Sequence, residues 1–178
     1  MYFGESSPED APGAGHSRFD ELCQALGRVH GQYAEYRQQC ALFAGRFRDR
    51  LQRYLGAPDG NVSFYARQGT FNGRKVDGPI SAMHLGEDAS WHFGVVIDLY
   101  VEESVFPGHC VGFKIGLKKV DNEFHLLIEE EPLMIVEEHN DEQLERVFAR
   151  MFEIVRTRYE NSFQEFLRTG DSNRRFGF

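Results

Sequence analysis

Apolar residues near the start of the chain recur at alternating steps of three and four positions, the period of an α-helix with one narrow apolar face. Nine residues follow this spacing without a slip, and we name them the seam: Phe19, Leu22, Leu26, Val29, Tyr33, Tyr36, Cys40, Phe43 and Phe47. A helix over residues 17–55 is about 58 Å long at 1.5 Å per residue, whereas a domain of this size is roughly 30–40 Å across. The pattern therefore predicts a long helix that extends beyond its domain or lies along a partner.

Two glycines weaken this predicted helix. Gly27 and Gly31 lie outside the seam, and each costs about 1 kcal/mol in a helix interior. One alternative is a continuous helix that tolerates both residues. The other is a break near residues 27–31 that leaves one helix over 17–27 and another over 32–55. The seam keeps its phase across the glycines, which slightly favours the continuous helix.

From residue 91 onward, apolar residues occur at every second position, which is typical of strands with one buried face. Short connections between these strands favour an antiparallel meander. The best strand predictions cover residues 91–102, 111–118, 124–128 and 133–136. Weaker ones cover residues 62–67, 74–80 and 81–85, with a hairpin turn at Asn72-Gly73.

A second helical pattern follows the strands. It opens at Asn140, where Gln143 stands three positions on as a capping-box partner. The two long helices are the only candidates to cover the apolar face of the sheet. The sequence thus predicts an α+β fold in which an antiparallel β-meander of about five to seven strands is covered by a long N-terminal and a long C-terminal helix. We expect residues 17–169 to form a single domain, with residues 1–16 a disordered leader and 170–178 a loose tail.

Composition narrows the class of protein. No apolar run approaches the length of about 20 residues that spans a bilayer, and the Gly/Pro-rich, acidic start does not resemble a signal peptide. The three cysteines are an odd number without metal-type spacing, which favours reduced thiols in the cytoplasm. Motifs for nucleotide, metal or hydrolase sites are absent, so no catalytic residue, metal ligand or cofactor is assigned.

Charge is uneven along the chain. The net charge of −8 disfavours general nucleic-acid binding, but residues 46–75 carry a net charge of +5 and residues 98–145 one of −10. Arg46, Arg50 and Arg53 recur on one helical face, which keeps nucleic-acid contact open as a minor alternative. The plainer interpretation is two solvated surfaces.

Two further features involve charged side chains. The segment from Gln68 to Lys75 combines glycines with Arg74 and Lys75 near Arg67, a composition suited to an anion, although a solvated hairpin tip is the plainer interpretation. Phe71 at the tip would serve as a partner anchor. On the sheet, Asp98 is expected to face Lys114 across a hairpin as an ion pair.

Taken together, these patterns indicate a non-catalytic binding or adaptor protein that acts through protein–protein association, as a homodimer or as a subunit of a larger complex. The expected partner contacts are Tyr33, Tyr36, Phe43, Phe47 and Phe71. The alternative is a small enzyme or ligand-binding domain for an anionic or nucleotide-like molecule. That alternative would use Arg67, Arg74 and Lys75, with help from Asp98 and His92.

Overall fold

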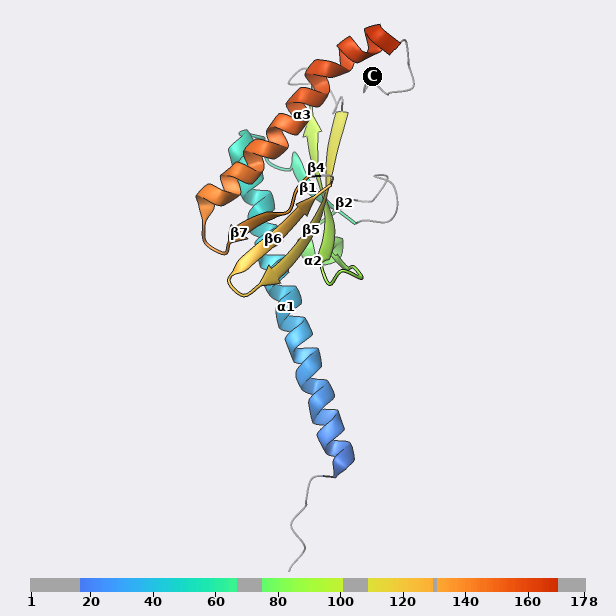
Figure 1. Ribbon diagram of the computed structural model, residues 1–178, viewed down its shortest axis with the longest axis vertical. Coiled ribbons are helices and arrows are strands. Elements are labelled where there is room, and N and C mark those ends of the chain that lie inside the picture. Colours follow the sequence, from blue (N-terminus) through green and yellow to red (C-terminus); the bar gives the residue numbers. More distant parts are fainter. Residues whose placement is uncertain (1–16, 67–74, 101–108, 130, 170–178) are drawn as a thin grey trace, which may run out of the picture. The chain divides into compact units, whose positions relative to one another are not determined.

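The computed structural model describes residues 17–66, 75–100, 109–129 and 131–169, and it has the predicted α+β fold (Figure 1). A long N-terminal helix, a C-terminal helix and an antiparallel sheet of seven strands are present. The elements in chain order are α1 (Arg18–Leu55), β1 (Val62–Tyr65), β2 (Lys75–Val76), α2 (Pro79–Ala82), β3 (His84–Leu85), β4 (Trp91–Leu99), β5 (His109–Val120), β6 (Glu123–Ile128), β7 (Met134–Glu137) and α3 (Asp141–Thr169). The chain divides into two compact units, residues 1–35 and 36–178, so the boundary falls within the sequence of α1.

Helix α1 is one uninterrupted helix, as the continuous alternative predicts. Its first turn is closed by a reciprocal pair, because Asp20 N–H donates to Ser17 Oγ at 3.1 Å and Ser17 N–H donates to Asp20 Oδ2 at 2.9 Å. The hydrogen bonds from Ser17 hold the pKa of Asp20 below its usual value. A Cβ atom added at Gly27 or Gly31 would meet no atom within 4 Å, so packing within the described residues does not require either glycine. Among these residues, no helix offers a stretch long and apolar enough to span a membrane.

The sheet has the strand order β2-β1-β4-β5-β6-β7, and β3 pairs with the remaining length of β4. Every pairing is antiparallel, and β4 to β7 form the predicted meander (Figure 1). The longest pairing joins β4 and β5, from Trp91 opposite Leu117 to Leu99 opposite His109. The turn between β5 and β6 lies at Asp121, whose φ of 51° is the left-handed conformation that Asp tolerates better than most residues.

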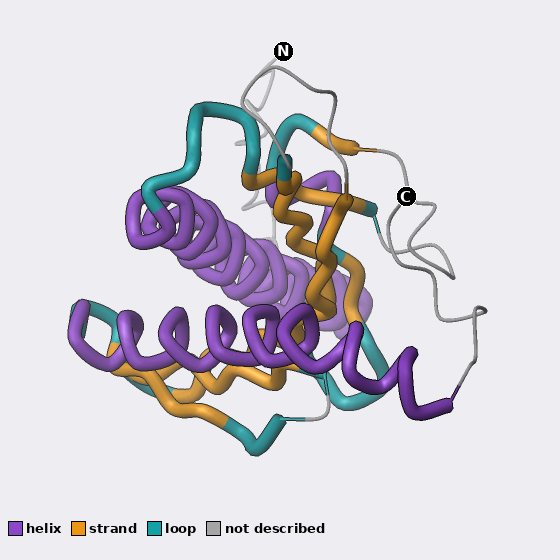
Figure 2. Tube along the Cα trace, turned by 90° about the horizontal axis from the view of Figure 1, so that it is seen from above, coloured by secondary structure: helices purple, strands orange, loops and turns teal. Residues whose placement is uncertain are grey.

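Within residues 36–178, the last five turns of α1 and the first half of α3 pack against the apolar face of the sheet (Figure 2). Phe43 of α1 stacks on Phe124 of β6 with ring centroids 4.0 Å apart. Phe47, one turn further along, meets the edge of Phe148 of α3 at 5.1 Å. One helical face of α1 therefore contacts both the sheet and the other helix.

The segment before β4 differs from its sequence prediction. Residues 81–85 are predicted as a strand, but Pro79–Ala82 forms a short helix and only His84–Leu85 is strand. Pro79 stands at the start of this helix, where its fixed φ suits the helical conformation and its missing N–H costs nothing. The residues after Pro79 carry no local signal that predicts a helix at this position.

The packing of Phe47 makes a prediction about stability. Its side chain is fully buried, so we expect Phe47→Ala to lower the free energy of unfolding by about 3–5 kcal/mol, and Phe47→Leu by clearly less. Leu42→Ala on the same helix is the control, because Leu42 is 66% exposed and should change stability by no more than about 0.5 kcal/mol. Urea unfolding followed by circular dichroism measures all three, and equal losses at Phe47 and Leu42 would contradict the observed packing.

Candidate interaction site on helix α1

The seam divides into two parts with different surroundings. Its first five members are exposed, at 72% for Phe19, 69% for Leu22, 59% for Leu26, 46% for Val29 and 56% for Tyr33. We name these five residues the open seam. The remaining four, Tyr36, Cys40, Phe43 and Phe47, form the closed seam and pack within residues 36–178. The same sequence pattern thus has two different structural outcomes.

The closed seam is part of the chain's own core. Cys40, Phe43 and Phe47 are at most 3% exposed, and the Tyr36 hydroxyl donates to the carbonyl of Ala89 at 3.0 Å while its ring lies 6.4 Å from that of Trp91. Burial raises the pKa of Tyr36 to about 12 and that of Cys40 to about 11. Phe43 and Phe47, predicted as partner contacts, are therefore engaged by their own fold, because the apolar face of the sheet covers them.

The open seam is a row of large apolar side chains that no described part of the chain covers in the same way. Isolated exposed apolar residues are common on protein surfaces, but a contiguous row is a mark of an interaction site. Tyr33 is the one predicted partner contact that belongs to this row. Phe19, Leu22, Leu26 and Val29 belong to the same predicted seam, although they are not among the five residues named individually as expected partner contacts. The spacing could not distinguish exposed from covered members.

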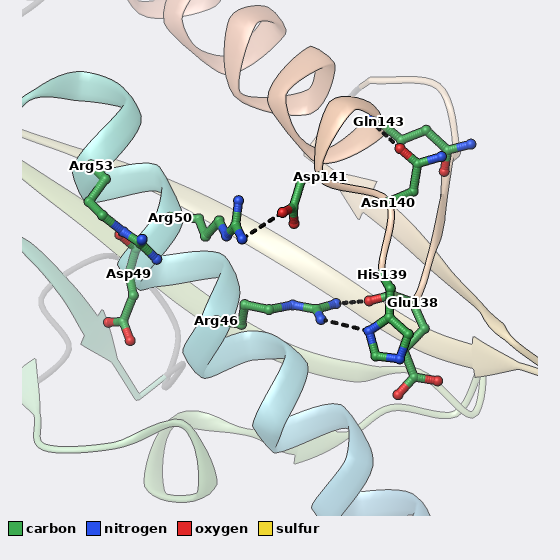
Figure 3. Close-up of polar contacts among 9 residues, drawn as sticks. All are labelled: Arg46, Asp49, Arg50, Arg53, Glu138, His139, Asn140, Asp141 and Gln143. Atoms are coloured by element: carbon green, nitrogen blue, oxygen red, sulfur yellow. Dashed lines mark hydrogen bonds and ion pairs between the residues drawn. The ribbon is translucent and has the colours of Figure 1, made fainter.

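The three arginines on one face of α1 have partners, two of them outside the helix (Figure 3). The Arg46 guanidinium donates to the carbonyl of Glu138 and lies 3.5 Å from Nδ1 of His139. Arg50 forms an ion pair of 2.6 Å with Asp141 at the first position of α3. Arg53 donates to the carbonyl of Asp49, one turn back in its own helix. Arg46 and Arg50 thus tie α1 to the connection between β7 and α3.

Several hydrogen bonds hold the connection between β7 and α3. Asn140 caps α3 as predicted, accepting from Gln143 N–H at 3.1 Å, while Gln143 Oε1 accepts from Glu137 N–H at 2.7 Å. Lys119 donates to Glu138 at 2.9 Å and holds the pKa of that carboxyl below its usual value. The connection borders an open, acidic hollow of about 930 Å³, lined by Asn122, Glu123 and residues 137–142.

The predicted anion site is only partly within the described residues. Arg67, Phe71 and Arg74 lie outside them. Lys75 is exposed at the start of β2 and donates from Nζ to the carbonyl of Gly60 at 3.2 Å. In the described ranges, no three His, Cys, Asp or Glu side chains come together so as to hold a metal ion.

Asp98 and Lys114 do not face each other as expected, because the register of β4 and β5 places each of them opposite another residue. Lys114 stands opposite Gly94, and Asp98 stands opposite Cys110. The Cys110 thiol donates to Asp98 Oδ1 at 3.0 Å. Desolvation of the sulfur and this bond to a carboxylate raise the pKa of Cys110 to about 11. His92, near the start of β4, forms a hydrogen bond of 3.0 Å with Asp88, which holds the pKa of that carboxyl down at about 2.

No protein-family model, curated protein or solved structure matches this chain.

The contacts of Arg46 predict a structural role. We expect Arg46→Met, which keeps an apolar stem, to lower the free energy of unfolding by about 1–3 kcal/mol, because it removes the charged donor from the partly buried carbonyl of Glu138. Arg53→Met is the matched control, since Arg53 bonds only within its own helix among the contacts described here. Urea unfolding gives the stabilities, and hydrogen exchange should show faster exchange at residues 138–140 in Arg46→Met alone. Equal stability of the two variants would contradict this role.

The contact between Cys110 and Asp98 predicts low thiol reactivity. The thiolate is the reactive form, so a nearby carboxylate slows alkylation at pH 8. We expect Asp98→Asn to accelerate iodoacetamide labelling of Cys110 several-fold, measured by peptide mass spectrometry with Cys23 as internal reference. Asp88→Asn serves as the control variant, and an unchanged rate in Asp98→Asn would show that the carboxylate does not restrain the thiol.

Proposed function

We propose that this protein is a non-catalytic binding protein that acts through protein–protein association, with the open seam of α1 as its contact surface. The observation that carries the proposal is the exposure of five consecutive seam residues, Phe19 to Tyr33, in a pattern whose continuation is buried. Burying an apolar side chain of this size contributes about 1.5–3 kcal/mol before costs. Covering the row with another helix would realise that free energy.

The helix over residues 18–35 supplies a second, physical reason. Isolated helices shorter than about 12–15 residues are marginal in water, and in proteins most helical stability comes from packing of an apolar face, which this stretch lacks in the single chain. This stretch also contains Gly27 and Gly31, which each cost about 1 kcal/mol. Association through the open seam would supply the missing packing.

Other functions have less support. Lys75, the described member of the predicted anion site, is hydrogen-bonded to Gly60, and Arg46 and Arg50 have partners within the fold. An adaptor that works as a homodimer or as a subunit of a larger complex fits the open seam better than a ligand-binding enzyme does. Cys23, Cys40 and Cys110 are free, which favours a reducing compartment, and we place the association in the cytoplasm.

The proposal predicts that charge on the open seam abolishes association. We expect the wild-type chain to give a solution mass above 20.5 kDa that rises with concentration, and Leu22→Glu/Leu26→Glu to remain at the monomer mass. Gln24→Glu/Ala34→Glu is the control, because it adds the same charge to the same helix outside the seam. Multi-angle light scattering from about 5 to 200 μM measures the masses, a range that detects micromolar dissociation constants.

Partners other than a second copy are covered by the same variants. Co-purification from cells that express the tagged chain should show bound protein with wild type and control and none with the seam variant. If wild type, seam variant and control agree both in mass and in co-purification, the open seam is not a contact surface and the proposal fails.

A further inference from the structure

We infer that residues 27–31 of α1, which we name the gate, exchange between helix and coil in the single chain, so that the open seam is assembled on one face only while the gate is helical. This exchange takes place without unfolding of residues 36–178. The inference goes beyond the proposed function, because it describes how the open seam forms and holds whether or not a partner covers it.

The N-terminal half of α1 contains no buried residue. Every residue from 18 to 35 is exposed except Ala25, which is half-buried. The anchor that follows in sequence consists of Tyr36, whose contacts are described above, and Arg37, whose guanidinium lies 5.6 Å from the centre of the Trp91 ring. Segments with few buried apolar contacts open locally at a low free energy, independently of the rest of the fold. Opening up to this anchor therefore exposes no buried core.

Weak helix formers are concentrated in the gate. Four of its five residues have lower helix propensity than the straight-chain residues, and these are Gly27, Val29, His30 and Gly31. The fifth, Arg28, gains no ion pair along the helix, because no acidic residue stands three or four positions from it. Neither glycine fills a packing need among the described residues, since an added Cβ would meet no atom within 4 Å. The effect of the glycines is consequently on the helix–coil equilibrium.

The residues before the gate depend on it for their helical state. Residues 18–26 alone are shorter than the roughly 12–15 residues below which isolated helices are marginal in water. They are helical by elongation from the buried turns of α1, and this elongation has to pass through the gate. When the gate is coil, residues 18–26 lose that connection, and Phe19, Leu22 and Leu26 no longer lie on the same face as Tyr33.

The two glycines set the fraction of chains in which the open seam is assembled. Replacing one interior glycine by alanine favours the helical state by about fivefold, so Gly27→Ala/Gly31→Ala favours it by about 25-fold. Any molecule that recognises only the assembled seam binds with an affinity reduced by the fraction of chains in that state. The gate thereby makes recognition of the seam dependent on a local conformational equilibrium.

Hydrogen exchange of the full chain tests the gate. Wild type and Gly27→Ala/Gly31→Ala are compared at about 1 μM, with Gly45→Ala as the matched control. Gly45 lies in the same helix, and an added Cβ there makes an ordinary contact 4.0 Å from Pro79. Rates are normalised to the same peptides in the urea-unfolded chains, which removes the intrinsic effect of each substitution.

The expected result is a division of exchange rates along α1. In wild type, residues 22–30 should exchange within about tenfold of the unfolded rate, and residues 40–51 far more slowly, because only the latter contain the buried turns. Gly27→Ala/Gly31→Ala should slow exchange at residues 22–30 by about three- to 25-fold. Gly45→Ala should leave the rates at residues 22–30 unchanged.

Two results would overturn the inference. Equal protection of residues 22–30 and 40–51 in wild type would show that α1 opens only together with the whole fold. Unchanged exchange in Gly27→Ala/Gly31→Ala would show that the glycines do not control opening. Both results leave the proposed function standing, because that function fails only if Leu22→Glu/Leu26→Glu associates like wild type.

Discussion

The packing of Phe43 and Phe47 is the interaction on which the rest of the fold depends. The sheet has one apolar face that must be covered, and α1 and α3 cover it. Phe43 of α1 contacts Phe124 of the sheet, and Phe47 of α1 contacts Phe148 of α3. The polar contacts follow from the same geometry. Once that face of α1 is fixed, Arg46 comes to lie beside the carbonyl of Glu138. Arg50, one turn further along the helix, then meets Asp141. A single helix orientation therefore sets the core and the connection that starts α3.

This anchoring also explains how the N-terminal part of α1 can be helical. Helix formation has a costly nucleus and a cheaper elongation step. The buried turns that contain Cys40, Phe43 and Phe47 supply that nucleus, so residues before Tyr36 need only elongate it. Elongation through Gly27 and Gly31 still has a cost, and the helix there gains no buried side chain from the seam in the single chain. Added packing on the open seam would consequently stabilise this part of the helix.

The sequence predicted what is periodic and missed what depends on partners. The helical period of the seam, the alternation after residue 91 and the Asn140 cap are local signals, and the corresponding elements are present. The division of the seam is not local, because Leu26 and Phe43 have equivalent spacing and differ only in what covers them. The pairing of Asp98 with Cys110 depends on the register along the whole length over which β4 pairs with β5, which no residue type reveals. The partners of Arg46 and Arg50 come from about 90 positions away, beyond any short-range pattern.

The length of the open seam limits the kind of association that it supports. A straight α-helix drifts by about 20° per heptad from a strict seven-residue repeat, so five layers across two heptads drift by about 40°. That is less than the width of an amphipathic face, about 100°. A partner helix can therefore contact the open seam along its whole length without supercoiling. A row this short must still overcome the loss of translational and rotational freedom on binding, about 4–15 kcal/mol. Such a contact is expected to be reversible and concentration-dependent, which suits an adaptor whose partners exchange better than a permanent assembly.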